Sequence, residues 1–202
     1  MASLVVKEIF RSIQGEGPFS GYPAVFIRLS GCNLSCDFCD TDFQGGKNYY
    51  VDELVKKVQN IAEGTDLVVL TGGEPFAQNL TELTIRLVLK KFTIQVESNG
   101  SINPHNFEQW DYIYLVVSPK YAGVNPDVVS HAKALKFVLK DKEEPNSYLI
   151  EWAKNKGVAV YLSPCDEKDE LKNKANMFWI RDMALRLNVR ISLQIHKILE
   201  VV

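Results

Sequence analysis

The sequence has 202 residues, of which 46% are hydrophobic and 24% are charged. Its 23 basic and 25 acidic residues give a formal net charge of −2, which excludes the strongly basic surface that binds nucleic acid or an anionic membrane. No stretch approaches the apolar length of a membrane span, and the first residues lack the basic region of a secretory signal. We therefore expect a single domain that binds a small molecule. We also expect the protein to be cytoplasmic, where thiols stay reduced.

Apolar runs and helical periodicities alternate along the chain. Strands are predicted at residues 4–10, 23–29, 66–70, 92–96, 112–117, 134–139, 158–162 and 189–195. Helices are predicted at 51–62, from 80, from about 145 and at 177–187. This alternation predicts an α/β fold with a parallel sheet of about seven or eight strands, in the form of a complete or partial (β/α) barrel.

Three cysteines, Cys32, Cys36 and Cys39, lie directly after the apolar run 23–29. Thiolates this close repel one another and must share a cation, so a metal or an iron–sulfur cluster is expected. A structural zinc ion would need a fourth ligand such as His or Asp. A four-iron cluster on three cysteines would keep one iron open for chemistry. The fourth cysteine, Cys165, is predicted to be a buried thiol.

Other candidates lie beside predicted strand ends, where α/β barrels place their ligand sites. Arg28 interrupts an apolar strand, so it faces either an anion or solvent. The paired glycines of Thr71-Gly72-Gly73-Glu74-Pro75 allow close approach to the backbone, although such a turn can also be a plain connection. Gln14-Gly15-Glu16-Gly17 offers an amide and a carboxylate on a flexible backbone.

The spacing Cys-x-x-x-Cys-x-x-Cys resembles that of the radical S-adenosylmethionine (SAM) enzymes, in which the open iron binds the amino and carboxylate groups of SAM. Three further stretches narrow the resemblance to the 7-carboxy-7-deazaguanine synthases, over nearly the whole chain: Gln14-Gly15-Glu16-Gly17 with Arg28, Asp40-Thr41, and Leu193-Gln194-Ile195-His196-Lys197. The resemblance implies a single radical SAM domain over residues 1–202, with the partial or modified (β/α) barrel of that superfamily.

The resemblance also implies a reaction. A 5′-deoxyadenosyl radical from SAM would abstract hydrogen from carbon six of 6-carboxy-5,6,7,8-tetrahydropterin. The ring would then contract with loss of ammonia to 7-carboxy-7-deazaguanine, in queuosine biosynthesis. In this family SAM is regenerated.

Site roles are implied in the same way. Cys32, Cys36 and Cys39 would hold the 4Fe-4S cluster, and Thr41 would help to bind Mg²⁺. The substrate would be bound by Ile13, Gln14, Gly15, Glu16, Arg28, Thr71 and His196, with Arg28 on its carboxylate. SAM would be bound by Phe38, Cys39, Asp40, Gly73, Glu74, Ser118, Pro119, Lys120, Ser163 and Asp166. Without the family resemblance, Thr41 would be interpreted as an ordinary turn residue and Phe38 as a residue that packs within its loop. His196 would be interpreted as a core or surface histidine without a catalytic or binding role.

Two partners are implied by resemblance: an external electron donor, such as flavodoxin or ferredoxin, and a second copy in a homodimer. One feature departs from the family, because many relatives supply a late proline to the pterin pocket and this sequence has no proline after Pro164.

Two other functions fit part of the pattern. A glycyl-radical-enzyme activase shares the cysteine spacing and a short barrel but acts on a protein. It gives no role to four residues: Gln14, Glu16, Arg28 and His196. A non-enzymatic binding module stabilised by a structural zinc ion would leave the Gly-Gly-Glu-Pro turn unexplained.

Overall fold

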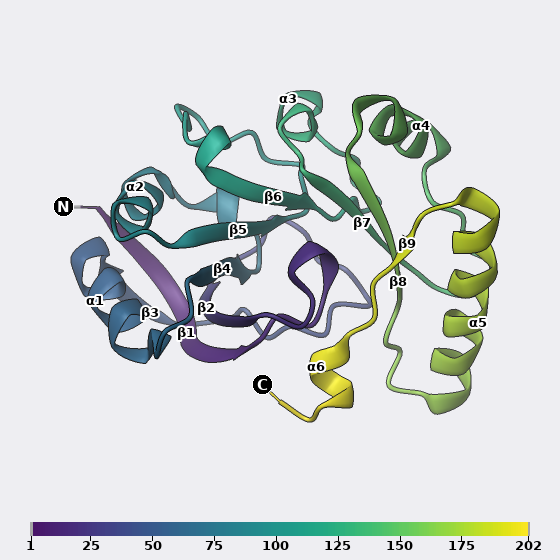
Figure 1. Cartoon of the computed structure of the whole chain (residues 1–202), viewed down its shortest axis with the longest axis horizontal. Coiled ribbons are helices and arrows are strands. Elements are labelled where there is room, and N and C mark those ends of the chain that lie inside the picture. Colours follow the sequence, from purple (N-terminus) through teal and green to yellow (C-terminus); the bar gives the residue numbers. More distant parts are fainter. Residues whose placement is uncertain (1, 202) are drawn as a thin grey trace.

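Figure 1 shows a computed structural model of the protein, which describes residues 2–201. The strands are β1 (Ser3–Ile13), β2 (Pro23–Leu29), β3 (Lys47–Tyr50), β4 (Leu67–Gly72), β5 (Thr93–Ser98), β6 (Ile113–Val117), β7 (Ala134–Leu139), β8 (Ala159–Pro164) and β9 (Arg190–Ile191). The helices are α1 (Val51–Ala62), α2 (Thr81–Leu89), α3 (Pro126–Ser130), α4 (Ser147–Lys156), α5 (Glu170–Leu187) and α6 (Ile195–Ile198). Three 3-10 turns are η1 (Gly17–Phe19), η2 (Pro75–Ala77) and η3 (Trp110–Tyr112).

The strands form one open sheet in the order β3-β1-β2-β4-β5-β6-β7-β8-β9. Every pairing from β2 to β9 is parallel, with helices in most of the connections. The sheet curves but does not close, because β3 and β9 are separate edges (Figure 1). This confirms the prediction of a partial (β/α) barrel and excludes a complete one.

The first strand departs from the parallel pattern. β1 pairs antiparallel with β2 and with β3, so it extends the sheet beyond the barrel strands. The strand β3 was not predicted, since Lys47-Asn48-Tyr49-Tyr50 is short and largely exposed and has no clear apolar alternation. Its place is set by pairing with Ser3–Val6.

Helices cover the outer side of the curved sheet (Figure 1). Alternate residues of the central strands, such as Ile27, Leu70 and Val96, are fully buried against them in one apolar core. In α1 the apolar residues at helical spacing, among them Leu54 and Val58, face the same core. Burying each such side chain contributes about 2 kcal/mol to folding.

The inner face of the sheet is different, because polar and charged residues occupy alternate positions there. Arg28, Gln95 and Lys136 each lie between apolar neighbours that point to the helices, and Glu97 follows one such neighbour, Val96. The loop after β1 folds over this face, with Phe19 packed edge-on against Tyr114 at 5.1 Å between ring centroids. The inner face thus has small apolar clusters, such as Phe26 with Val69 and Val116 with Tyr161, while its charged residues line a site nearer the carboxyl ends of the strands.

The carboxyl-terminal segment corrects one prediction. Instead of a strand over 189–195, only Arg190 and Ile191 join the sheet, and α6 follows, so His196 lies on a helix. The strand ends early because Ser192 Oγ accepts a hydrogen bond from the Gly17 N–H at 2.8 Å. Ile195 N–H then donates to the Gly15 carbonyl at 3.1 Å. These bonds divert the chain across the open side of the sheet.

Among residues 2–201, no helix combines the length and the apolar character needed to cross a membrane.

Candidate functional site

The predicted site residues gather at the carboxyl ends of β2, β4 and β5. Parallel pairing sets Arg28 opposite Thr71, and Leu70 opposite Val96, so Glu97 comes next to Thr71. Strand residues alternate between faces, which places Arg28, Thr71 and Glu97 together on the inner face. The register of three strands thus assembles residues that lie far apart in the sequence.

Two adjoining pockets lie over these strand ends. The cysteine pocket, of about 200 Å³, contains the predicted residues Glu16, Cys32, Cys36, Phe38, Cys39, Asp40, Thr41, Thr71, Gly73, Ser118, Lys120, Ser163 and Asp166. The arginine pocket, of about 460 Å³, contains Ile13, Gln14, Gly15, Glu16, Arg28, Asp40, Thr41, Thr71 and His196. Because Glu16, Asp40, Thr41 and Thr71 line both, two ligands can lie in contact here.

The three cysteines lie on one loop between β2 and β3. Their thiols are free; Cys32 and Cys36 are half-buried and Cys39 is exposed. A backbone turn from Cys39 N–H to the Cys36 carbonyl, at 3.2 Å, shapes the loop, and Gly31 N–H bonds to the Phe43 carbonyl at 3.1 Å to close its base. In residues 2–201, no three His, Cys, Asp or Glu side chains lie close enough together to hold a single metal ion.

The Gly-Gly-Glu-Pro turn is packed against the start of this loop. A Cβ atom on Gly73 would lie 1.9 Å from the Gly31 carbonyl oxygen, so a side chain there is excluded. Gly73 N–H donates to the Leu29 carbonyl at 3.2 Å, and Glu74 N–H donates to the Gly31 carbonyl at 2.9 Å. The turn therefore fixes the backbone that leads into Cys32.

Glu74 does not present its side chain to either pocket. It is fully buried, and its carboxylate accepts hydrogen bonds from Ser98 Oγ and from the Asn99 and Phe76 N–H groups at 2.7–3.0 Å. Burial raises the pKa of Glu74 despite these donors. The side chain serves to join the turn to the end of β5.

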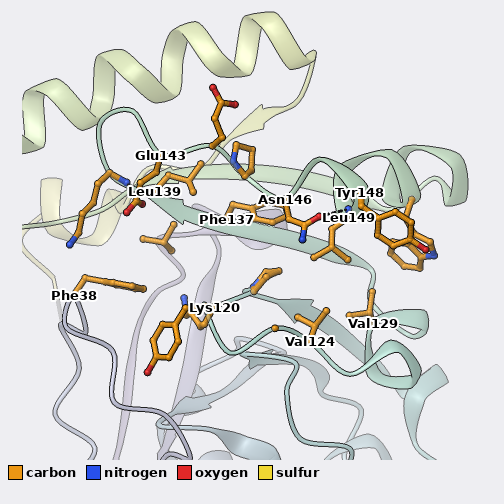
Figure 2. Close-up of a pocket in the computed structure, with 18 of the residues that line it drawn as sticks. Phe38, Lys120, Val124, Val129, Phe137, Leu139, Glu143, Asn146, Tyr148 and Leu149 are labelled. Carbon is orange, nitrogen blue, oxygen red and sulfur yellow. Dashed lines mark hydrogen bonds between the residues drawn. The ribbon is translucent and has the colours of Figure 1, made fainter.

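A larger cavity of about 760 Å³ adjoins the cysteine pocket (Figure 2). Phe38 and Lys120 lie at one end and Tyr148 and Leu149 at the other (Figure 2). Lys120 Nζ lies 5.3 Å from the Phe38 ring centroid, close enough for a cation–π contact. Burial lowers the pKa of Lys120. Pro119, predicted to contact SAM, lines this cavity instead of the cysteine pocket.

Glu97 is the centre of a hydrogen-bond network in the floor of both pockets. Its carboxylate accepts from Gln14 Nε2 at 3.0 Å, from Thr71 Oγ1 at 2.9 Å and from Gln95 Nε2 at 2.8 Å. The network ties the loop after β1 to strands β4 and β5. It brings two of the predicted substrate residues to one carboxylate.

Glu16 and Lys136 form a buried ion pair beside this network. Burial alone would raise the pKa of Glu16, but the charge and hydrogen bond of Lys136 lower it. Burial would lower the pKa of Lys136, yet Glu16 raises it above its usual value. Both groups are therefore charged at neutral pH, and each compensates the desolvation of the other.

Arg28 is held by β1. Its Nε donates to Glu8 Oε1 at 2.6 Å, and its guanidinium lies 5.5 Å from the Phe10 ring centroid. The guanidinium has two further terminal nitrogens, in the planar geometry that binds a carboxylate with two hydrogen bonds. Its side chain is 21% exposed, and it lines the arginine pocket.

His196 lies directly against Gly15. A Cβ atom on Gly15 would lie 1.8 Å from His196 Nδ1, so only glycine leaves room for the imidazole. Burial lowers the pKa of His196, which keeps the ring neutral at pH 7. His196 thus lies beside the Gln14–Gly17 loop, and it comes from α6 and not from the end of a strand.

Sequence reasoning missed Glu97, Lys136 and the contacts of Lys197. The first two had a signal, because each is a charged residue inside an apolar strand, as Arg28 is. Lys197 had none beyond its place after His196. Its Nζ bonds to Asp40 Oδ2 at 2.8 Å and to Asp166 Oδ2 at 2.6 Å.

Comparison with known proteins identifies the family. A sequence model of the Radical SAM superfamily matches residues 26–164. The 7-carboxy-7-deazaguanine synthase of Rickettsia prowazekii is 36% identical, and the alignment covers 97% of this chain and 88% of the relative. That of Hyperthermus butylicus is 34% identical, with 98% and 93% covered. The chain belongs to the 7-carboxy-7-deazaguanine synthase family of radical SAM enzymes.

Solved structures agree with this family in their fold. The crystal structure of QueE from Escherichia coli matches with a TM-score of 0.72 and 24% identity, over 95% of this chain and 94% of that one. The structure of Streptococcus suis SuiB bound to S-adenosylmethionine matches with a TM-score of 0.56 and 14% identity, over 80% of this chain and 48% of that one. The partial barrel is the shared feature.

Radical SAM enzymes use a 4Fe-4S cluster and SAM, and the residues of this site fit both groups. Three free cysteines on one loop can bind three different irons, each through one thiolate. The close packing of Gly73 against Gly31 leaves no side chain between the turn and the loop. Open space and polar groups adjoin the thiols, including Asp40, Ser118 and Lys120.

We predict that Gly15→Ala destabilises the protein by about 1–3 kcal/mol, because the new methyl group overlaps the His196 ring. Urea unfolding would measure this loss. The same substitution in a His196→Ala background should cost less, since the clashing ring is gone and only the backbone N of residue 196, at 2.9 Å, remains close. An equal cost in both backgrounds would show that the imidazole ring is not the source of the clash.

We also predict that Glu74→Gln lowers the free energy of unfolding by about 1–3 kcal/mol. The amide turns an N–H₂ group toward donors that need an acceptor, which leaves buried groups unpaired. Glu151→Gln, an exposed change on α4, is the matched control and should have little effect. Equal stability of the Glu74→Gln variant and the wild type would contradict the buried role of this carboxylate.

Proposed function

We propose that this protein converts 6-carboxy-5,6,7,8-tetrahydropterin to 7-carboxy-7-deazaguanine with loss of ammonia, as a radical SAM carbon–nitrogen lyase of queuosine biosynthesis. The observation that carries the proposal is the adjacency of two pockets: three cysteines line one, and Arg28 with the Glu97 network lines the other. The site can thus hold a redox cofactor beside a small polar acid.

The cofactor side consists of the cysteine loop and the ends of the neighbouring strands. Cys32, Cys36 and Cys39 would hold the cluster, which together with SAM supplies hydrogen-atom abstraction. SAM would lie among Phe38, Cys39, Asp40, Gly73, Ser118, Lys120, Ser163 and Asp166 in the cysteine pocket, with Pro119 toward the larger cavity. Glu74 would contribute through its backbone, because its carboxylate is committed to Ser98 and Asn99.

The substrate side has a chemistry that matches a carboxylated pterin. Arg28 would bind the carboxylate with two charge-assisted hydrogen bonds. A pterin ring also presents neighbouring N–H donors, and the Glu97 carboxylate is the acceptor in the floor of the pocket. Gln14 and Thr71 hold Glu97 in place and can themselves contact the ring.

The remaining residues of this side orient the ring and exclude water. Ile13 and Gly15 line the wall of the arginine pocket, and the neutral imidazole of His196 can exchange a hydrogen bond with the substrate. Lys136 holds Glu16 as a fixed charge between the two pockets. A preorganised charge of this kind needs no rearrangement when the substrate reacts.

Further parts of the proposal concern ions and partners. Thr41 Oγ1 lies 3.4 Å from Asp40 Oδ1 at the boundary of both pockets, a pair of hard oxygen ligands that would suit Mg²⁺ next to the substrate carboxylate. An external one-electron donor such as flavodoxin or ferredoxin would reduce the cluster. We further propose that the 202 residues act as one domain in the cytoplasm, as a homodimer.

The test is an anaerobic assay of the reconstituted protein with SAM, Mg²⁺ and dithionite, following 7-carboxy-7-deazaguanine by mass spectrometry. We predict that Cys36→Ala abolishes product and lowers bound iron. Cys165→Ala is the matched thiol control and should keep its iron, because this buried side chain lies outside the cysteine motif. Iron retained by Cys36→Ala would contradict the assignment of the cluster ligands.

In the same assay Arg28→Met should lower kcat/KM for the pterin by about 100-fold, the effect of losing a charge-assisted bidentate contact. Arg186→Met is the control, since Arg186 pairs with Glu144 at 2.7 Å on the exposed surface. SAM cleavage without any change in the pterin would overturn the substrate assignment and favour an activase that acts on a protein.

A further inference from the structure

The helix α6, which carries His196, is not held in place by apolar packing. None of its four residues is buried, and Ile198 and Leu199 are 69% and 56% exposed. A four-residue helix is not stable by itself. Its position must therefore come from a small number of polar contacts.

Three residues make the polar contacts that join α6 to the rest of the site. At its start, Ile195 N–H donates to the Gly15 carbonyl at 3.1 Å. Two residues later, Lys197 Nζ lies between two carboxylates, at 2.8 Å from Asp40 Oδ2 and 2.6 Å from Asp166 Oδ2. Gln194 Nε2 adds a longer bond to the same Asp40 oxygen at 3.4 Å.

The two carboxylates come from separate parts of the cofactor side. Asp40 follows the last cysteine of the loop, and Asp166 follows the end of β8. Both line the cysteine pocket, and Asp40 also lines the arginine pocket together with His196 and Lys197. The ammonium of Lys197 thus joins the helix that carries His196 to both carboxylates.

The setting of this contact favours a specific role over an ordinary surface ion pair. Lys197 is 37% exposed and its partners are 36% and 25% exposed, so solvent screens the pair only in part. One ammonium also compensates two carboxylates that would otherwise repel each other. The hydrogen bond of Lys197 holds the pKa of Asp166 well below its usual range.

We propose that Lys197 is a positioning residue that fixes α6 against Asp40 and Asp166. It thereby holds His196 in the arginine pocket at a fixed position relative to the SAM-binding residues. This rests on the proposed function. Without the ammonium, α6 would be free to leave the arginine pocket, and SAM cleavage would no longer be matched to a correctly placed pterin.

The test compares wild type with Lys197→Met, which keeps the length of the side chain and removes its charge. In the cofactor-free protein, backbone amides of residues 197–201 should exchange hydrogen about tenfold faster in the variant, while the core strands are unchanged. In the reconstituted protein, the KM for the pterin should rise about tenfold, and 5′-deoxyadenosine released per product should rise by a similar factor. Affinity for SAM should fall as Asp40 and Asp166 lose their common partner.

Two variants separate positioning from general stability. Lys197→Arg should restore both the exchange protection and the ratio of 5′-deoxyadenosine to product, because a guanidinium can also bridge two carboxylates. Lys154→Met is the matched control: it removes an exposed ammonium that bonds to the Leu187 carbonyl at 2.6 Å, away from both pockets, and should change neither quantity.

Unchanged exchange of residues 197–201 in Lys197→Met would overturn the proposal, as would an unchanged ratio of 5′-deoxyadenosine to product. Faster exchange throughout the core, not restored by Lys197→Arg, would indicate a merely structural role and would also overturn it. If the wild type makes no deazaguanine, the proposed function fails separately. The exchange and SAM-affinity measurements need no pterin and still decide the role of Lys197.

Discussion

The structure depends on the cost of placing charges on the inner face of a parallel sheet. Lys136 is buried and the side chain of Glu16 is only 13% exposed, and a charge in such a place is tolerated only beside an opposite charge. Their pairing fixes the loop after β1 inside the curve of the sheet. That loop in turn supplies Gln14 to Glu97 and receives the carboxyl-terminal segment at Gly15 and Gly17. The charges that make the inner face suitable for a polar ligand thus also hold the site together.

An open sheet leaves one side of such a site without a strand to close it. Here the loop after β1 meets the carboxyl-terminal segment across the opening through a backbone bond at Gly15, and Lys197 pairs that segment with Asp40 and Asp166. Neither contact buries much apolar surface. This closure is therefore locally less stable than the core, since locally stable regions are those with the most buried apolar contacts.

The cysteine motif comes from one segment of the chain, whereas the polar residues of the arginine pocket come from several. Cys32, Cys36 and Cys39 lie on one loop, so their proximity follows from sequence alone. Arg28, Thr71 and Glu97 come from three strands and meet only through the register of β2, β4 and β5. Joining the two sets is what turns a general radical SAM scaffold into a pocket for a specific acid.

The sequence by itself determined the family, the alternation of strands and helices that makes a mostly parallel sheet, and the cysteine loop, because these depend on local spacing and on the apolar pattern. Glu97 and Lys136 are charged residues within largely apolar strands, a pattern that is visible in the sequence, although neither was predicted as a site residue. Only the tertiary structure decided that Glu74 turns into the core, that residues 189–195 leave the sheet after Ile191, and that Lys197 joins Asp40 to Asp166. These outcomes depend on which distant donor or carboxylate lies within reach, and that is set by the packing of the whole chain.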